Sequence, residues 1–339
     1  MTLLHHAWWG VDLFFVLSGF SLGLAHLRAV EEKKATPAGA FYLRRVARIV
    51  PGFLAALGLV LVTHPSWVVK DGFASALVAH LALLQGYTGL LGGFVFIGAS
   101  WTLTTEAQFY VVFPLLARRL LERRGWRLGA ALVVGSWLAR GALHALVLEP
   151  GVHTGLWELT QRRLIVSRFD QFVLGALAAT AYVAIERSTA LVRASRAAPW
   201  VLALALPALV VAFRLEGELY LDRGGSWPYA LMSLVTTVIV LAVALTRGRA
   251  ARVLSFRPLA AIGLVSYGIF LNHQLVLGFV EWFAPFPSRA PSWPRFAFVG
   301  GVALALSSLV GLASWRMVER PGLGALARWQ RRTPRISST

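Results

Sequence analysis

Two carboxylates stand inside apolar stretches of this sequence, where an unpaired charge is costly. Asp12 lies near the start of the segment GVDLFFVLSGF, and Glu106 lies in the segment SWTLTTEAQFYVVFPLL with Tyr110 one helical turn later. A charged side chain that faces lipid at the centre of a helix costs roughly 2.5–3.5 kcal/mol on insertion scales. We therefore expect these side chains to face a protein interior, a partner or a wet cavity. The alternative for Glu106 and Tyr110 is a structural hydrogen bond to a neighbouring helix.

Two arginines have a spacing that suits a phosphorylated ligand. Arg45 and Arg48 lie three residues apart in the segment FYLRRVARIVPG, so a helix would place both on one face. Two guanidinium groups on one face can hold a pyrophosphate by bidentate hydrogen bonds. The alternative is an ordinary basic cluster at the membrane surface, which is the interpretation we prefer for Arg44.

Polar residues also interrupt two later apolar segments. Arg168 and Asp170 open the segment SRFDQFVLGALAA, where they could bind an acceptor molecule or pair with another buried charge. The alternative is an exposed ion pair at the membrane interface. His273 follows Asn272 in the segment SYGIFLNHQ. A histidine in such a helix is more often a hydrogen-bonded packing residue than a catalyst, and a role in substrate binding is the alternative.

The composition is that of an integral membrane protein. The mean hydropathy is +0.66, and 57% of the residues are hydrophobic while 14% are charged. The chain has a formal charge of +18, but its basic residues come in short clusters between apolar runs, which is the pattern of cytoplasmic membrane loops. Nucleic acid is therefore not an expected partner. The sequence contains no cysteine, which excludes disulfides and thiolate chemistry.

The apolar runs predict an all-α polytopic membrane protein with about nine to ten transmembrane helices in a single bundle. A further apolar run at residues 72–98 is glycine-rich in its second half, and we expect it to be re-entrant, peripheral or a tight pair of short helices. The nine expected spans lie near residues 10–28, 46–64, 101–118, 128–148, 164–185, 199–214, 227–246, 259–281 and 296–315.

The segment GVDLFFVLSGF resembles the signature of the membrane-bound acyltransferase family 3. Five further segments match the family pattern: the four quoted above that begin at Phe41, Ser100, Ser167 and Ser266, and VERPG at residues 318–322. The resemblance implies an O-acyltransferase, EC 2.3.1.-, of the bacterial inner membrane. Such an enzyme moves an acyl group, with acetyl favoured, from acyl-CoA to a hydroxyl of a surface glycan or another secreted or lipid-linked acceptor.

The resemblance also implies roles for particular residues. Arg45 and Arg48 would meet acyl-CoA, which is a co-substrate, and no resident cofactor or metal is expected. Glu106 would belong to the catalytic site, and Tyr110 would line its cavity. The substrate-site candidates are Tyr110, Arg168 and His273.

A histidine in the first helix of the family acts as the general base. Neutral imidazole suits the removal of a hydroxyl proton near working pH, and the histidines upstream of Asp12 are His5 and His6. Asp12 would orient the ring or stabilise its protonated form. The alternative is an interfacial pair beside Trp8 and Trp9 in an aromatic belt.

The resembled family begins with a helix that precedes GVDLFFVLSGF, and we expect this chain to lack most of it. The expected organisation is one integral-membrane domain over residues 1–335 and a short cytoplasmic tail at residues 336–339. Two alternatives remain: a transporter or flippase of a lipid-linked sugar, and an inactive truncated relic. The sequence has no second copy of GVDLFFVLSGF, which weighs against a transporter built from repeats.

Overall fold

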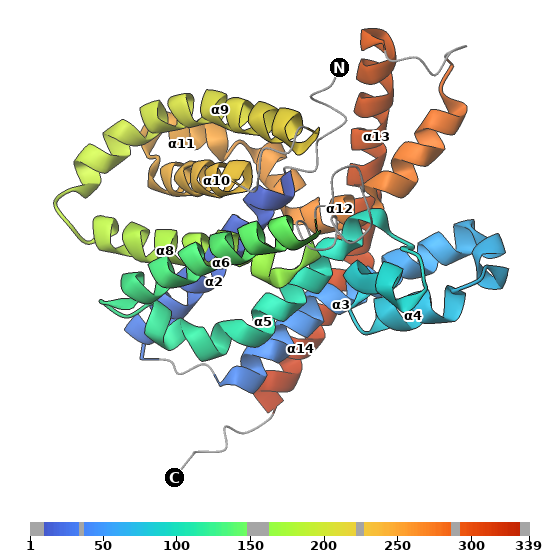
Figure 1. Cartoon of the computed structure of the whole chain (residues 1–339), viewed down its shortest axis with the longest axis horizontal. Coiled ribbons are helices and arrows are strands. Elements are labelled where there is room, and N and C mark those ends of the chain that lie inside the picture. The colour runs from blue at the N-terminus through green and yellow to red at the C-terminus, as the bar shows by residue number, and fades with distance from the viewer. Residues whose placement is uncertain (1–9, 34–36, 148–162, 222–226, 286–291, 333–339) are drawn as a thin grey trace. The chain divides into compact units, whose positions relative to one another are not determined.

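The computed structural model describes residues 10–33, 37–147, 163–221, 227–285 and 292–332, and this part of the chain is helical without a β-strand (Figure 1). It divides into two compact units, which are treated separately below. Unit 1 comprises residues 1–36 and 102–256, and unit 2 comprises residues 37–101 and 257–339. The expectation of an all-α polytopic membrane protein is confirmed.

Eight helices of the described residues are long and apolar enough to cross a membrane. Seven are separate, and the eighth is a continuous stretch in which α13, a π-helical turn and α14 follow one another. A ninth expected span at residues 101–118 is also helical, but its polar residues keep its mean hydropathy below that of the others. The eight are α2 (Gly10–Glu31), α3 (Ala38–Thr63), α6 (Gly125–Val147), α8 (Phe169–Glu186), α9 (Leu191–Leu221), α10 (Trp227–Leu245), α12 (Arg257–Phe283), and α13 (Trp293–Ser314) with η7 (Trp315–Glu319) and α14 (Arg320–Arg332).

The structure extends two of the expected spans. Helix α3 begins at Ala38 directly after Pro37, although the apolar pattern starts near residue 46. Its first turns carry arginines, which are good helix formers although they add nothing to an apolar pattern. Helix α9 likewise extends beyond residues 199–214 at both ends. The remaining unit 1 helices are α5 (Trp101–Leu120) and α11 (Gly248–Leu254).

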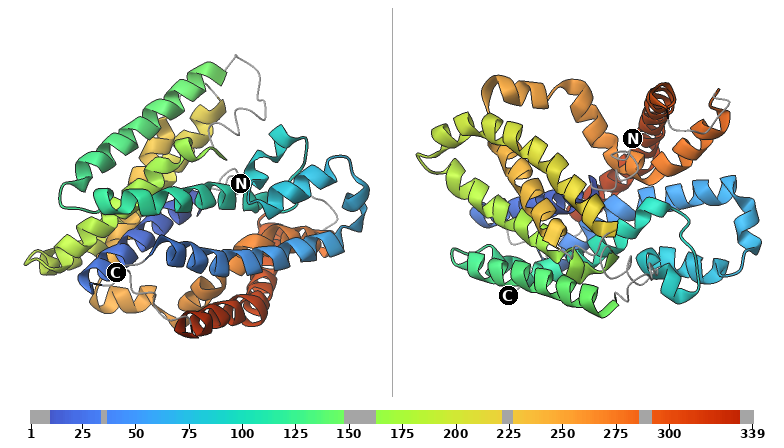
Figure 2. Two further views of the ribbon diagram at one scale, coloured as in Figure 1. Left: turned by 90° about the horizontal axis from the view of Figure 1, so that it is seen from below. Right: turned by 45° about the horizontal axis from the view of Figure 1, so that its top comes forward.

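Unit 1 is built around a close crossing of α2 and α8, which can be followed in Figure 1 and in both views of Figure 2. A Cβ added at Gly19 would overlap the carbonyl oxygen of Phe172, and one added at Gly175 would overlap the carbonyl oxygen of Val16. The two backbones therefore touch where each helix has a glycine. Small residues permit this kind of packing in membrane helices, where burial from lipid brings no hydrophobic gain.

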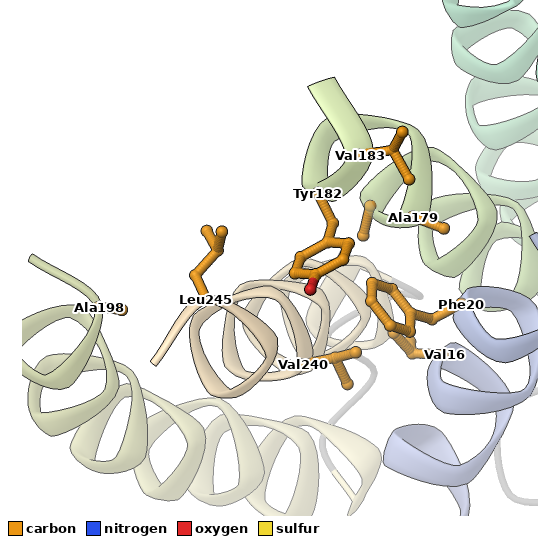
Figure 3. Packing of buried hydrophobic residues seen from close by; sticks show 9 residues of the cluster. Val16, Phe20, Ala179, Tyr182, Val183, Ala198, Val240 and Leu245 are labelled. Atoms are coloured by element: carbon orange, nitrogen blue, oxygen red, sulfur yellow. The ribbon is translucent and has the colours of Figure 1, made fainter. Parts of the chain in front are cut away.

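An apolar cluster extends this crossing to α9 and α10. Val16 and Phe20 of α2 pack beside Tyr182 of α8 and Val240 of α10 (Figure 3). The rings of Phe20 and Tyr182 meet edge to face with their centroids 5.9 Å apart. The cluster fixes α2 against two neighbours and so determines which residues of α2 face α8.

Unit 2 contains α3, α12 and α13 together with the segment at residues 72–98. That segment forms no spanning helix but the short helix α4 (Phe73–Leu81) and the 3₁₀ turn η3 (Gln85–Leu91), near two other short turns, η2 (Pro65–Val69) and η4 (Gly98–Ser100). Of the three alternatives given for this segment, which were a re-entrant segment, a peripheral one and a tight pair of short helices, the structure shows short helical elements. Helices α12 and α13 touch through Gly268 and Gly311, where an added Cβ at Gly268 would lie 2.7 Å from the Gly311 Cα.

His80 of α4 holds the residues that follow η3. Its Nδ1 donates to the carbonyl oxygen of Ala76 at 2.7 Å, and its Nε2 accepts from the backbone N–H of Phe96 at 3.1 Å. The ring is fully buried and stacks on Phe53. Burial lowers the pKa of His80 from its ordinary value of 6.5. The folded unit therefore needs the neutral imidazole, because a protonated Nε2 could not accept the Phe96 N–H.

We expect Gly19→Ala to destabilise the protein by about 1–3 kcal/mol or more, because the new methyl group forces α2 and α8 apart. The measurement is thermal unfolding of the detergent-solubilised protein. Gly135→Ala is the matched control, since a Cβ at that position of α6 meets nothing within 4 Å. Equal melting temperatures for the two variants would show that the helices are not in backbone contact.

We expect unit 2 to lose stability in acid through His80. Because the folded pKa lies below the unfolded one, this stabilisation is complete above about pH 6.5 and declines as the pH falls through the folded pKa. Thermal unfolding at about pH 7.5 and pH 5 measures it, and His80→Asn, which keeps a donor and an acceptor but does not titrate, should weaken the pH dependence. An unchanged pH dependence in this variant would rule out His80 as its source.

Candidate functional site

Asp12 forms a buried ion pair at the beginning of α2. The Nη1 atom of Arg168 lies 2.6 Å from Asp12 Oδ1, and neither side chain is exposed. Gln171 donates its side-chain N–H to the same oxygen. Asp12 also stands in the first turn of α2, where the helix dipole favours a negative charge. Its second oxygen, Oδ2, is buried and has no hydrogen-bond partner among the described residues.

A second buried ion pair lies beside the first. The Nη2 atom of Arg140, on α6, is 3.3 Å from Asp170 Oδ1, and both side chains are fully buried. Trp137 donates its indole N–H to Asp170 Oδ2 at 2.8 Å. The Tyr229 ring of α10 lies close to both guanidinium groups, 4.9 Å from Arg140 Cζ and 5.2 Å from Arg168 Cζ.

These contacts join four helices through one charge-balanced group. We call it the buried charge cluster; its two cations and two anions offset each other, which makes burial at membrane depth tolerable. Arginine suits this place because its planar fork can meet carboxylates and stack on an aromatic ring at once. The cluster consists of Asp12, Arg140, Arg168, Asp170, Gln171 and Tyr229.

Glu106 belongs to a separate polar group on α5. Its Oε1 accepts a hydrogen bond from Ser18 of α2 at 2.9 Å and another from Tyr110. Glu106 and Tyr110 are both buried. The hydrogen bond from Ser18 joins Glu106 to a neighbouring helix, as in the structural alternative given above, and the one from Tyr110 lies within α5. We call Ser18, Glu106 and Tyr110 the Glu106 group.

Helix α2 connects the two polar groups. Asp12 and Ser18 are six residues apart, which corresponds to about 9 Å along the helix axis and to faces about 120° apart. Asp12 accordingly faces α8 while Ser18 faces α5. One helix thus contributes a side chain to both the buried charge cluster and the Glu106 group.

The arginines expected to meet acyl-CoA belong to unit 2. The guanidinium of Arg45 lies over the Phe41 ring at 5.6 Å from its centroid. Arg48, one turn later, is exposed and lies within electrostatic range of the buried Glu319 carboxylate in the π-helical turn η7. Glu319 also accepts from the Ser314 hydroxyl at 2.9 Å.

His273 makes a hydrogen bond within its own helix. Its Nδ1 is 2.7 Å from the carbonyl oxygen of Phe270, so Nδ1 carries the proton and Nε2 is left as an acceptor. The preceding residue, Asn272, donates to the carbonyl oxygen of Gly268 at 2.9 Å. His5 and His6 lie outside the described residues.

The structure brings some of the expected site residues together and adds others. Asp12 meets Arg168, and Glu106 meets Tyr110, all within unit 1, whereas the arginine pair and His273 belong to unit 2. Sequence reasoning missed three members of the buried charge cluster and one of the Glu106 group. An arginine inside an apolar span is functional or paired by default, so Arg140 could have been found by its position. The other missed residues are Ser18, Gln171 and Tyr229.

We expect Asp12 and Arg168 to be strongly coupled in stability. Asp12→Asn or Arg168→Gln alone leaves an uncompensated buried charge, which costs about 3–5 kcal/mol, and the double variant should lose less than the sum. Thermal unfolding of the two single variants and the double variant measures the coupling.

The matched control is the Arg118–Glu122 pair at the end of α5, whose atoms are 3.7 Å apart but whose side chains are 90% and 60% exposed. Removing either partner there should change stability by less than about 1 kcal/mol. Additive losses at Asp12 and Arg168 would contradict the ion pair.

Comparison with known proteins identifies the family. A family model described as an acyltransferase domain, Acyl_transf_3, matches residues 7–312. The peptidoglycan O-acetyltransferase OatA of Listeria monocytogenes is 23% identical over 291 residues, which cover 79% of this chain and 44% of the relative. The O-acetyltransferase OatA of Staphylococcus aureus is 22% identical over 326 residues, which cover 92% of this chain and 52% of the relative.

The chain therefore spans about half the length of these curated relatives. No solved structure matches it. Because the family model covers most of the sequence and the described helices include eight candidate membrane spans, this multi-pass chain belongs to the membrane-bound acyltransferase family 3.

Proposed function

We propose that this protein transfers an acetyl group from acetyl-CoA to a hydroxyl of a surface glycan at the bacterial inner membrane. The observation that carries the proposal is the acyltransferase family match over residues 7–312. Relatives named O-acetyltransferases support the acetyl group, and one of them is named for peptidoglycan, which supports a glycan acceptor. The buried polar groups of unit 1 support a reaction centre inside the membrane domain.

In the proposed reaction the acceptor hydroxyl oxygen attacks the thioester carbonyl carbon. The new C–O bond forms, the C–S bond breaks, and the hydroxyl proton passes through a general base to the CoA sulfur, which leaves as the thiol. His5 or His6 is the proposed base. The free Oδ2 of Asp12 supports this role for Asp12, since a carboxylate acceptor can hold an imidazole in one tautomer.

The Glu106 group and the arginine pair take separate roles in this proposal. Glu106 and Tyr110 line the cavity and position the reacting groups through the hydrogen bonds around the Glu106 carboxylate. Arg45 and Arg48 bind the phosphates of acyl-CoA, because paired guanidinium groups match phosphate oxygens in charge and geometry. Arg168 and His273 are proposed to contact the acceptor.

We expect Glu106→Gln to reduce acetyl transfer by at least about 100-fold, because the amide replaces the negative charge that Ser18 and Tyr110 surround. Transfer from radiolabelled acetyl-CoA in membranes is the measurement. Leu115→Ala is the control, since Leu115 lies on the same helix and is 75% exposed. Near-normal activity of Glu106→Gln at equal expression would remove Glu106 from the site.

We expect Arg48→Ala to raise the KM for acetyl-CoA about 10-fold with a smaller effect on kcat, because a lost phosphate contact weakens ground-state binding. Arg44→Ala, one turn earlier on α3, is the matched control and should leave both constants near their original values. If both substitutions raise KM equally, the arginines act as a general basic surface rather than as a phosphate site.

The histidine variant tests the base itself. His5→Ala/His6→Ala should abolish label transfer while the protein remains in the membrane. If the unaltered protein transfers no label to any membrane or surface fraction, the acyltransferase proposal fails and transport of a lipid-linked sugar takes its place.

A further inference from the structure

Unit 2 contains an elongated cavity that the proposed reaction does not use. Its volume is about 730 Å³, which is within the usual range for small-molecule sites. It lies between the end of α3, the short turns that follow α3, and the second half of α12, with α13 along one side. We call it the α12 groove; six of its lining residues are Val60, Trp67, Phe96, Leu275, Gly278 and Phe283.

The wall of the α12 groove is suited to hydrocarbon. Charged residues are absent from its lining within the described chain. The polar side chains at its edge are engaged by the protein: Thr63 donates to the carbonyl oxygen of Val60 at 3.0 Å, and Gln274 accepts from the backbone N–H of Ala99 at 3.1 Å. A ligand in the groove therefore gains little from hydrogen bonds and much from apolar burial.

The length and direction of the groove match one leaflet of a bilayer. Leu271 and Phe283 of α12 both line it, and their separation of twelve residues corresponds to about 18 Å along a helix. Half of a bilayer hydrocarbon core is about 15 Å. Because Leu271 lies near the middle of the spanning helix α12 and Phe283 at its end, the groove runs from mid-membrane depth to the membrane surface.

Polar and cationic groups are found at the surface end of the groove. His64, at the end of α3, lines the groove, and its Nδ1 donates a hydrogen bond to the carbonyl oxygen of Val60. The Lys70 ammonium lies 5.0 Å from the Phe94 ring centroid, and this ring packs against the groove residue Phe96 at 5.1 Å. Lys70 is exposed, so its ammonium can meet an anion at this end, although the exposed Asp71 that follows it carries the opposite charge.

An apolar channel of leaflet length with a cation at its surface end matches the shape of a phospholipid. We propose that the α12 groove binds one acyl chain of a membrane phospholipid, with the lipid phosphate beside His64 and Lys70. The site is separate from the proposed acyl-transfer chemistry, since the lipid is a bound structural ligand and not a reactant. The acyl chain would add dispersion contacts to the aromatic and aliphatic side chains of the lining.

Photo-crosslinking of the full chain in vesicles tests the site. Two phosphatidylglycerol probes are used, one with a diazirine at the end of an acyl chain and one with a diazirine near its carboxyl group. We expect the terminal probe to label the deep residues Leu271, Leu306 and Val310. The other probe should label Trp282 and Phe283 at the surface end.

Filling the groove provides the decisive variant. A Cβ at Gly278 meets nothing within 4 Å, so Gly278→Trp places an indole in the groove without a backbone clash and should lower labelling of the deep residues about 10-fold. Gly263→Trp is the matched control, because Gly263 is on the same helix, is equally open and does not line the groove. Thermal unfolding of both variants confirms that each is folded.

Four results would overturn the proposal. Equal labelling in Gly278→Trp and Gly263→Trp would mean that the probes report bulk lipid. If the two probes label the deep and the surface residues equally, the acyl chain of the lipid does not lie along α12. Equal labelling by a diacylglycerol probe without a phosphate, or no effect of Lys70→Gln on the phosphatidylglycerol probes, would remove the headgroup contact. Acetyl transfer by Gly278→Trp should remain normal, which separates this test from that of the proposed function.

Discussion

The backbone contact between α2 and α8 is the constraint on which the arrangement of unit 1 depends. Two helices that touch at glycines have no room for water or lipid between them, so every polar group at the crossing must find its partner in the protein. The Oδ1 atom of Asp12 does so with Arg168 and Gln171, at the beginning of α8. The close packing of α2 and α8 raises the free-energy cost of burying the Asp12 charge. It also brings the groups of α8 that stabilise this charge within hydrogen-bond distance.

The buried charge cluster connects the α2–α8 contact to two other helices of unit 1. The guanidinium of Arg168 lies near that of Arg140, and the two cations repel each other. The Asp170 carboxylate and the Tyr229 ring offset this repulsion. Removing any one of the four charged members leaves an excess charge for the others, so helices α2, α6 and α8 share one electrostatic balance, to which α10 adds the Tyr229 ring. Such a group holds its members in fixed orientations, which is what a reaction centre beside it requires.

Hydropathy and local spacing were sufficient to predict the helices and part of the site. Apolar runs of the right length mark spans because lipid leaves the backbone few alternatives, and Tyr110 could be paired with Glu106 because they are one turn apart. The partner of Asp12 was not predictable in this way, since Arg168 is 156 positions later and spacing along a helix says nothing about contacts between helices. The early start of α3 was missed because arginines add helical propensity without adding to an apolar pattern.

The contact of Gly19 with the carbonyl oxygen of Phe172 has a consequence for how this family can diverge. A clash between two side chains can be relieved by a smaller residue on the other helix, so such positions can change in pairs. Here the opposing atom belongs to the main chain, which every residue type carries. No single replacement on α8 can compensate for a larger residue at position 19, and an evolving lineage could accept one only by shifting a whole helix.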